Sequence, residues 1–384
     1  MTQPEATPIR PIAQVQMVRA FAALIVVIFH TQGELRHRGF PDPFPDLTVG
    51  AFGVDLFFVV SGFIMVYASD RLFGRWRAVL PFLARRLARI APLYWAFTLL
   101  FAGIALTLGR LPGHPQASAF HIAASFLFLP AARPEDGAFF PVYSLGWTLN
   151  YEMFFYLCFA AALGLRRRAA VAAVSVGLIG LVALGRLVAL PWPLFYWANP
   201  ISLEFVFGLW IGTATLAGFR LPARFGAGLA AAALVAVLLY VPHIDDRADW
   251  RGLAWGLPAA GLLLASLGAG RRREGPAGRL AVRIGDASYS LYLLHSTLFI
   301  AVFAGLARIV DPHRIPAPAY AALLVCASVA GAPVLFRWFE LPVTRALNRR
   351  IDRRAGRRAG TTAPAARATG RTGAAAIDVG KFPT

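Results

Sequence analysis

The chain has 384 residues, of which 58% are hydrophobic and 15% are charged, and its mean hydropathy is +0.60. Soluble domains carry about 25% charged residues, so this composition excludes an ordinary soluble protein and indicates a multispanning membrane protein. The net charge of +19 does not indicate nucleic-acid binding, because the basic residues gather in alternate loops, as membrane topology requires.

Ten apolar segments of about 20 residues are candidates for transmembrane helices. In chain order they lie near 14–31, 49–69, 90–108, 146–165, 169–185, 198–218, 225–241, 252–269, 287–307 and 317–338. The apolar stretch 119–130 is too short to span and is expected to lie at the interface or to re-enter. We therefore predict an all-α polytopic membrane helix bundle with a membrane domain at 14–344.

The distribution of basic residues orients this bundle. Of the 38 Arg and Lys residues, 28 lie in loops on the side of the N-terminus and 9 lie in the intervening loops. Short basic loops stay in the cytoplasm, so both termini are predicted to be cytoplasmic. Residues 1–13 would form a cytoplasmic N-terminal segment, and residues 345–384 a basic disordered tail that contacts anionic membrane lipids.

The first predicted span, RAFAALIVVIFH, has an ionisable residue at each end. Eleven residues of α-helix return almost to the same face, so Arg19 and His30 share one face about 16 Å apart. His30 would lie toward the outer end of the span and Arg19 toward the cytoplasm, where an arginine can also simply snorkel to the head groups.

Four more ionisable residues lie inside later spans. Asp55, Glu152 and Glu204 each come five or six residues into a span that enters from outside, and His295 lies near the middle of its span. Any one of them could make a structural hydrogen bond between helices. One outer depth is shared by His30, Asp55, Glu152 and Glu204. Four ionisable groups gathered at one depth favour a polar cavity or pathway, because a charge in the bilayer costs about 2.5 to 3.5 kcal/mol or more.

The loop before the third span is the most basic of the short loops. Arg85, Arg86 and Arg89 lie within one helical turn, so they are expected to present three guanidiniums side by side. Guanidiniums bind phosphate oxygens bidentately, which suits a polyphosphorylated ligand, although a positive-inside anchor is the simpler interpretation. Ser61 and Gly62 are expected to allow close helix packing, and Glu340 to pair with a loop arginine.

Six ordered motifs together resemble the membrane acyltransferase 3 family over residues 12–345. They are RAFAALIVVIFH (19–30), GVDLFFVVSGFIM (53–65), RRLARIAPLYW (85–95), SLGWTLNYEMFFY (144–156), SYSLYLLH (288–295) and FRWFELP (336–342). The chain is most similar to the stand-alone O-acetyltransferases that decorate bacterial exopolysaccharides of the succinoglycan type. The resemblance implies a ten-span core in the bacterial inner membrane and transfer of an acyl group, usually acetyl from acetyl-CoA, to a carbohydrate hydroxyl.

The family motifs place functional residues at Arg19, His30, Glu152 and the basic trio. The phosphates of an acyl-CoA would dock on the trio, and its uncharged arm would pass Arg19. An imidazole titrates near neutral pH, so His30 can accept the proton of an acceptor hydroxyl, and Glu152 would hold its other nitrogen. His30 could equally carry the acyl group itself.

The remaining predicted site residues, Asp55, Glu204 and His295, would bind the acceptor or line a channel. Acyl-CoA is expected as a co-substrate, with no permanently bound cofactor and no metal site, since the histidines lack ligand spacing. A glycan or lipid-linked glycan transporter, or a non-catalytic subunit of a polysaccharide export machine, would also need polar groups inside the membrane. Acyl transfer by purified protein distinguishes the enzyme from both of these alternatives.

Overall fold

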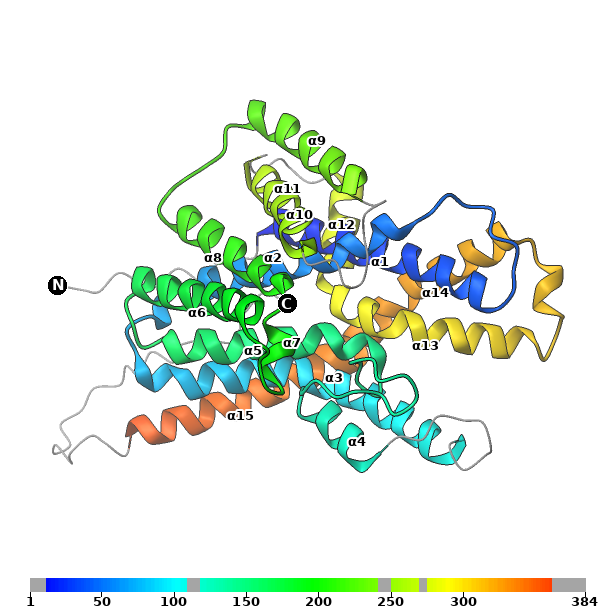
Figure 1. Ribbon diagram of the computed structural model, residues 1–384, viewed down its shortest axis with the longest axis horizontal. Coiled ribbons are helices and arrows are strands. Elements are labelled where there is room, and N and C mark those ends of the chain that lie inside the picture. Colours follow the sequence, from blue (N-terminus) through cyan, green and yellow to red (C-terminus); the bar gives the residue numbers. More distant parts are fainter. Residues whose placement is uncertain (1–11, 109–117, 241–249, 269–274, 361–384) are drawn as a thin grey trace, which may run out of the picture.

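Long apolar helices make up most of the structure, which is a computed structural model (Figure 1). It describes residues 12–108, 118–240, 250–268 and 275–360, with side chains as far as 354. The α-helices are α1 (Ala13–His37), α2 (Phe52–Ala68), α3 (Val79–Leu108), α4 (Ala119–Phe126), α5 (Trp147–Ala162), α6 (Arg167–Leu187), α7 (Leu194–Trp197), α8 (Leu203–Leu216), α9 (Ala223–Tyr240), α10 (Arg251–Ala254), α11 (Gly256–Gly268), α12 (Pro276–Asp286), α13 (Ser288–Leu306), α14 (Ala317–Leu335) and α15 (Leu341–Gly360). Short 3-10 turns are η1 (Thr48–Ala51), η2 (Asp70–Leu72), η3 (Trp76–Ala78), η4 (Ser144–Gly146), η5 (Pro200–Ser202) and η7 (Pro312–Arg314), and η8 (Phe336–Glu340) is a π-helix.

The prediction that the chain is a bundle of apolar helices is confirmed for the described residues. Each of the ten predicted spans contains a helix, and seven described helices are long and apolar enough to cross a membrane. The other three, α5, α8 and α11, have 16, 14 and 13 residues. The only β-type pairing in the described part of the chain is the isolated bridge between Ala132 and Phe139.

Helix α2 is the centre of the bundle, because α1, α5, α8 and α11 all pack against it. Its closest contact is with α8, where Gly62 and Gly208 let the two backbones touch. A Cβ added to Gly62 would stand 2.2 Å from the carbonyl oxygen of Phe205. The predicted packing role of Gly62 is therefore confirmed, and the contact fixes the height of α8 against α2.

Substituting Gly62 by alanine is expected to destabilise the protein by about 1 to 3 kcal/mol, because the backbones must separate to admit the methyl group. Gly228 of α9 is the matched control, since nothing lies within 4 Å of an added Cβ there. The measurement is thermal unfolding in detergent, where Gly228→Ala should leave the midpoint unchanged or raise it slightly. Equal midpoints for the two variants would contradict this packing.

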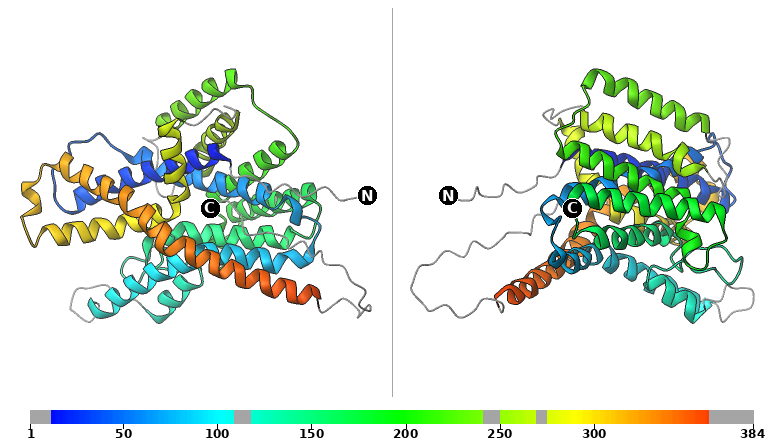
Figure 2. Two further views of the ribbon diagram at one scale, coloured as in Figure 1. Left: turned by 180° about the vertical axis from the view of Figure 1, so that it is seen from behind. Right: turned by 60° about the vertical axis from the view of Figure 1, so that its left-hand side comes forward.

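The C-terminal helices correct one prediction. The tail was expected to be disordered from residue 345, yet α14, η8 and α15 follow one another without a break to Gly360. Alanine, leucine and arginine favour helix even without an apolar stripe, and Figures 1 and 2 show α15 alongside α3. An ion pair of 2.7 Å between Arg85 and Asp352 joins the two helices. Residues 361–384 of the predicted tail, like 1–11 of the N-terminal segment, lie outside the described residues.

Residues 127–146, which are irregular apart from the short turn η4, form a layer over the N-terminal end of α5, where Trp147 lies. Helix α4 is held on α3, where the Tyr94 hydroxyl donates to Ser125 O (3.1 Å) and Trp95 Nε1 donates to Phe126 O (2.9 Å). The hydroxyl of Tyr143 in the same layer donates to Leu293 O of α13. The start of α5 is therefore recessed below this layer, which matters for the depth of Glu152.

Candidate active site

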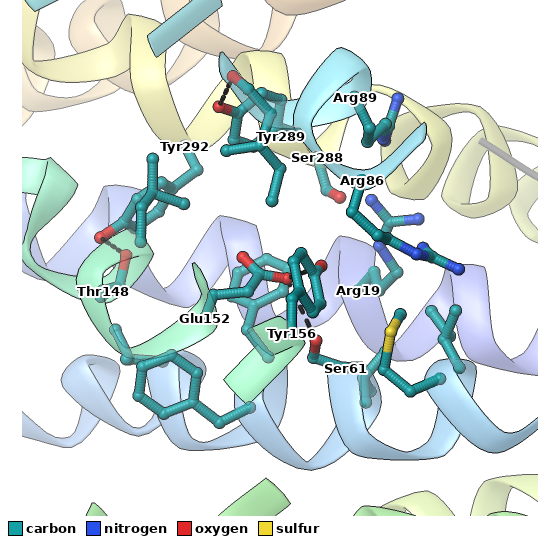
Figure 3. A pocket seen from close by; sticks show the side chains of 18 residues that line it. Arg19, Ser61, Arg86, Arg89, Thr148, Glu152, Tyr156, Ser288, Tyr289 and Tyr292 are labelled. Atoms are coloured by element: carbon teal, nitrogen blue, oxygen red, sulfur yellow. Dashed lines mark hydrogen bonds between the residues drawn. The ribbon is translucent and has the colours of Figure 1, made fainter. Parts of the chain in front are cut away.

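An elongated pocket of about 130 Å³ runs through the bundle between α1, α2, α3, α5 and α13. Figure 3 shows its three zones: arginines at one end, a carboxylate with two hydroxyls in the middle, and a tyrosine with a threonine at the other end. The polar side chains that line it are Arg19, Arg86 and Arg89, then Ser61, Glu152 and Tyr156, then Thr148 and Tyr292, with Ser288 and Tyr289 along one wall.

The arginine end brings together three of the four predicted basic site residues. Arg19 of α1 donates to Gln16 Oε1 (2.9 Å), and the Arg86 guanidinium lies 5.8 Å from the centre of the Tyr156 ring. Arg85 is the exception, because it pairs with Asp352 of α15 and does not line the pocket. Arg85 and Arg86 are adjacent in a helix, so about 100° separates their directions and only one of them can face inward.

A second network fixes Arg89 at this end. Nη1 of Arg89 donates to Oε1 of Glu340, and the Ser290 hydroxyl donates to Oε2 of the same carboxylate. Glu340 is the last residue of the π-helix η8 and is 2% exposed, so its expected pairing with a basic residue is confirmed. Nearby, at the end of α12, burial raises the pKa of the Asp286 carboxyl, and the positive charges of Arg19 and Arg89 oppose that rise.

Glu152 occupies the middle of the pocket. Its Oε1 accepts a hydrogen bond from the Ser61 hydroxyl (3.1 Å) and another from the hydroxyl of Tyr156. Charge-assisted hydrogen bonds of this kind hold the carboxylate in place in an otherwise apolar bundle. The negative charge thus lies directly beside the arginine end and not beside a histidine.

The prediction that Glu152 holds the imidazole of His30 is wrong in geometry. Gly50 packs against Phe29, the residue before His30, whereas Ser61, which binds Glu152, lies eleven residues farther along α2. That separation is about 16 Å at 1.5 Å per residue. The error comes from assuming that every span begins at one level, whereas α5 begins below the layer formed by residues 127–146.

The partner of His30 is His295 instead. Nδ1 of His30 lies 3.2 Å from Nε2 of His295 and 3.0 Å from the carbonyl oxygen of Val26, and the imidazole centroids are 4.9 Å apart. Nδ1 of His295 lies 3.2 Å from Leu291 O. The carbonyls assign the protons: each Nδ1 carries a hydrogen toward a carbonyl, so Nε2 of His295 is an acceptor. The single hydrogen on His30 Nδ1 is therefore shared between Val26 O and His295 Nε2. Nε2 of His30 is then unprotonated, and no described residue hydrogen-bonds to it.

Tyr292 connects the pocket to the histidine pair. Its hydroxyl donates to Leu145 O (3.1 Å) and lies 3.2 Å from Oγ1 of Thr148. Its ring is 6.1 Å from that of His295, one helical turn away on α13. The pocket thus ends at Tyr292, whose ring lies next to that of His295, while neither His30 nor His295 lines the pocket itself. The sequence marked this tyrosine only as part of the motif SYSLYLLH.

The predicted acceptor residues Asp55 and Glu204 lie elsewhere. Both are 0% exposed, and Asp55 is paired with Arg251 of α10, whose Nη2 is 3.1 Å from Oδ2. Neither carboxylate lines the pocket, and Arg251 was not singled out because it precedes an apolar segment as an ordinary loop residue. Direct contact of a sugar with these carboxylates is not compatible with their burial in this conformation. The cluster instead joins α2, α8 and α10.

Replacing Asp55 by asparagine is expected to destabilise the protein by about 3 to 5 kcal/mol, because it removes the fully buried carboxylate with which the partly buried Arg251 guanidinium pairs. Glu204→Gln should cost less, since Arg251 pairs with Asp55 and a glutamine keeps the size and the hydrogen-bonding capacity of the side chain beside Asp55. Detergent-solubilised thermal unfolding of the two variants checks this order. A larger loss for Glu204→Gln would show that Glu204 carries the pairing charge.

An inward arginine cluster, a carboxylate and an oriented histidine pair within a bundle of apolar helices define the class of the protein as a polytopic membrane-bound enzyme. Among the residues that the structure describes, no group of three or more His, Cys, Asp or Glu side chains could hold a metal ion. The profile of the acyltransferase domain family matches residues 12–337. The chain belongs to this family, the membrane acyltransferase 3 family, and is an acyltransferase that transfers groups other than amino-acyl groups.

Two relatives support the same assignment. The exopolysaccharide production protein ExoZ of Rhizobium meliloti is 38% identical over 291 residues, which cover 73% of this chain and 84% of that protein. The acyltransferase MdmB of Streptomyces mycarofaciens is 28% identical over 334 residues, covering 79% of this chain and 83% of that protein. No solved structure matches the chain.

Proposed function

We propose that the protein transfers an acyl group, acetyl in the first instance, from a cytosolic acyl-CoA to a hydroxyl of an exopolysaccharide or another cell-surface glycan. The observation that carries the proposal is the polar pocket, which extends from three arginines to Tyr292, and the ring of Tyr292 lies next to His295, the partner of His30. The printed name of the relative ExoZ supports a carbohydrate acceptor.

The pocket suits the donor because its charges are ordered along its length. The phosphates of an acyl-CoA would bind at the end formed by Arg19, Arg86 and Arg89, where guanidiniums provide bidentate donors. The hydroxyls and the carboxylate in the middle zone can hydrogen-bond the amides of an uncharged arm. The thioester would then lie near Tyr292, next to the histidines.

The transfer step needs one base and releases one thiol. Nε2 of His30 accepts the proton of the acceptor hydroxyl, whose oxygen attacks the thioester carbonyl carbon. The carbon–sulfur bond breaks, and the departing sulfur takes the proton back from the imidazolium. His295 accepts the Nδ1–H hydrogen bond and so keeps the lone pair of Nε2 directed at the hydroxyl. The same nitrogen could instead carry the acyl group, since it is the nucleophilic atom in a covalent relay.

The proposed topology has ten spans with both termini in the cytoplasm of a bacterial inner membrane. The excess of basic residues on the side of the N-terminus supports it. The arginine end of the pocket then faces the cytosolic donor, and the end of α1 beyond His30 faces the acceptor and any polysaccharide biosynthesis machinery.

The test is incorporation of labelled acetyl groups from acetyl-CoA into alkali-treated exopolysaccharide by purified protein in nanodiscs. Alkali removes ester-linked acyl groups and so exposes acceptor hydroxyls. Ester-linked label in the polysaccharide is the expected result, with release of one thiol for each acetyl group. Binding of acetyl-CoA without transfer to any glycan fraction would overturn the proposed acceptor class, and no binding of acetyl-CoA would overturn the donor.

A further inference from the structure

The face of α1 that carries His30 continues beyond it toward the end of the helix. Gly33, Glu34 and His37 follow His30 by three, four and seven residues, so they share its face. Phe21 and Ile28 lie on the opposite face, where they are 44% and 40% exposed and suit contact with lipid chains. The polar face therefore points inward, toward the side on which α2 and α13 lie.

This inward face is open at its outer end. Nothing lies within 4 Å of a Cβ added to Gly33, and both Gly33 and His37 are exposed. The flanking faces of the same helix are closed, because Gly50 packs on Phe29 on one side and Thr31 is 3% exposed on the other. An accessible surface of α1, the opening at Gly33 and His37, therefore begins directly beyond His30, on the side away from Arg19.

The side chains beside the opening are held in a fixed arrangement. Nε of Arg38 is 2.8 Å from Oε1 of Glu34, and both side chains are mostly buried. The Arg38 guanidinium also lies 4.3 Å from the centre of the Phe303 ring of α13. A carboxylate, a guanidinium and an aromatic ring provide hydrogen-bond acceptors, donors and an apolar surface, which together suit the hydroxyls and ring faces of a sugar. Figure 1 shows α1 and α13 running side by side toward this end of the molecule.

We infer that the outer turns of α1, at Gly33, Glu34, His37 and Arg38, form the acceptor subsite along which a carbohydrate hydroxyl reaches His30. The inference rests on the proposed function. It replaces Asp55 and Glu204, which are fully buried, with residues that follow the base on its own helix, of which Gly33 and His37 are exposed. Donor and acceptor then approach His30 from opposite ends of one helix face.

The first test blocks the opening without touching the donor pocket. In a Cys158→Ala, Cys326→Ala background, Gly33→Cys is treated with a bulky water-soluble maleimide in nanodiscs, and Ile28→Cys on the lipid face is the matched control. We expect Gly33→Cys to be labelled and then to lose at least about tenfold in acetyl transfer to alkali-treated exopolysaccharide, with unchanged binding of acetyl-CoA. Ile28→Cys should remain unlabelled and active. Labelled Gly33→Cys with full transfer would overturn the inference.

The second test measures acceptor recognition. Glu34→Gln should raise the KM for the polysaccharide by about 10- to 100-fold, since it replaces a charged hydrogen-bonding partner. The KM for acetyl-CoA should not change, which a general loss of folding would not produce. An unchanged polysaccharide KM would overturn the role of Glu34. If the wild-type protein binds acetyl-CoA yet acylates no glycan, the proposed acceptor class itself fails, and the two failures are thereby distinguished.

Discussion

Replacing His30 by alanine should lower the rate of acyl transfer by about 10²- to 10⁴-fold, which is the range that a general base contributes. The reason is local: Nδ1 of His30 is occupied by Val26 O and His295, so Nε2 provides the lone pair, and Tyr292 at the end of the pocket lies next to His295. Labelled acetyl transfer to polysaccharide by matched amounts of folded protein gives the rate. Binding of acetyl-CoA should persist, because the substitution leaves the arginines of the pocket unchanged.

Substitutions of His295 test whether this residue orients His30 by accepting its hydrogen bond. Glutamine at this position can still accept the hydrogen bond from His30 through its side-chain oxygen, whereas phenylalanine cannot. His295→Gln should therefore retain more transfer activity than His295→Phe at equal thermal stability. If His30→Ala transfers acetyl at the wild-type rate, His30 is a structural residue and the mechanism must use another base. If both His295 variants match the wild type, His295 does not orient His30.

The sequence predicted the helices well because hydropathy is a local property of a segment. All ten predicted spans contain helices, and the segment 119–130 holds the short α4. The tail was misjudged because residues 345–360 lack an apolar stripe. Their helix is an extension of α14 through η8, and the ion pair between Arg85 and Asp352 holds it against α3. Neither cause is visible in the composition of the tail.

Of the predicted site residues, some lie together in the pocket, but their pairing differs from the predicted one. Arg19, Arg86, Arg89 and Glu152 do meet in one pocket, and His30 does meet an ionisable partner. The partner differs because contacts between helices depend on how far each helix is shifted along its axis. Counting residues from the start of each span ignores the layer above α5, and that offset of about 16 Å separates Glu152 from His30. His295 was placed near the middle of its span by the same counting.

Two adjacent arginines of α3 allow a direct test of where the donor phosphates bind. Arg86 lines the pocket, whereas its neighbour Arg85 turns away to Asp352. Substituting Arg86 by alanine should raise the KM for acetyl-CoA by about 10- to 100-fold, because a hydrogen bond to a charged group contributes about 1.5 to 3 kcal/mol. The value of kcat should fall much less, since the phosphates lie far from the reacting carbonyl and are bound equally in the ground and transition states.

Arg85→Ala removes the same charge from the same helical turn, so it controls for a general loss of positive potential. It should leave the KM for acetyl-CoA within about twofold, because Arg85 does not line the pocket. It should loosen α15 only slightly, because partly exposed ion pairs typically contribute only about 0.2 to 1 kcal/mol. Isothermal titration with acetyl-CoA and with dephosphorylated acetyl-pantetheine completes the comparison. If Arg86 binds phosphate, its substitution weakens the first ligand and spares the second. Equal effects of Arg85→Ala and Arg86→Ala would mean that the donor phosphates bind outside this pocket. The arginines of α3 would then act only as a diffuse positive surface that anchors the helix at the cytoplasmic side.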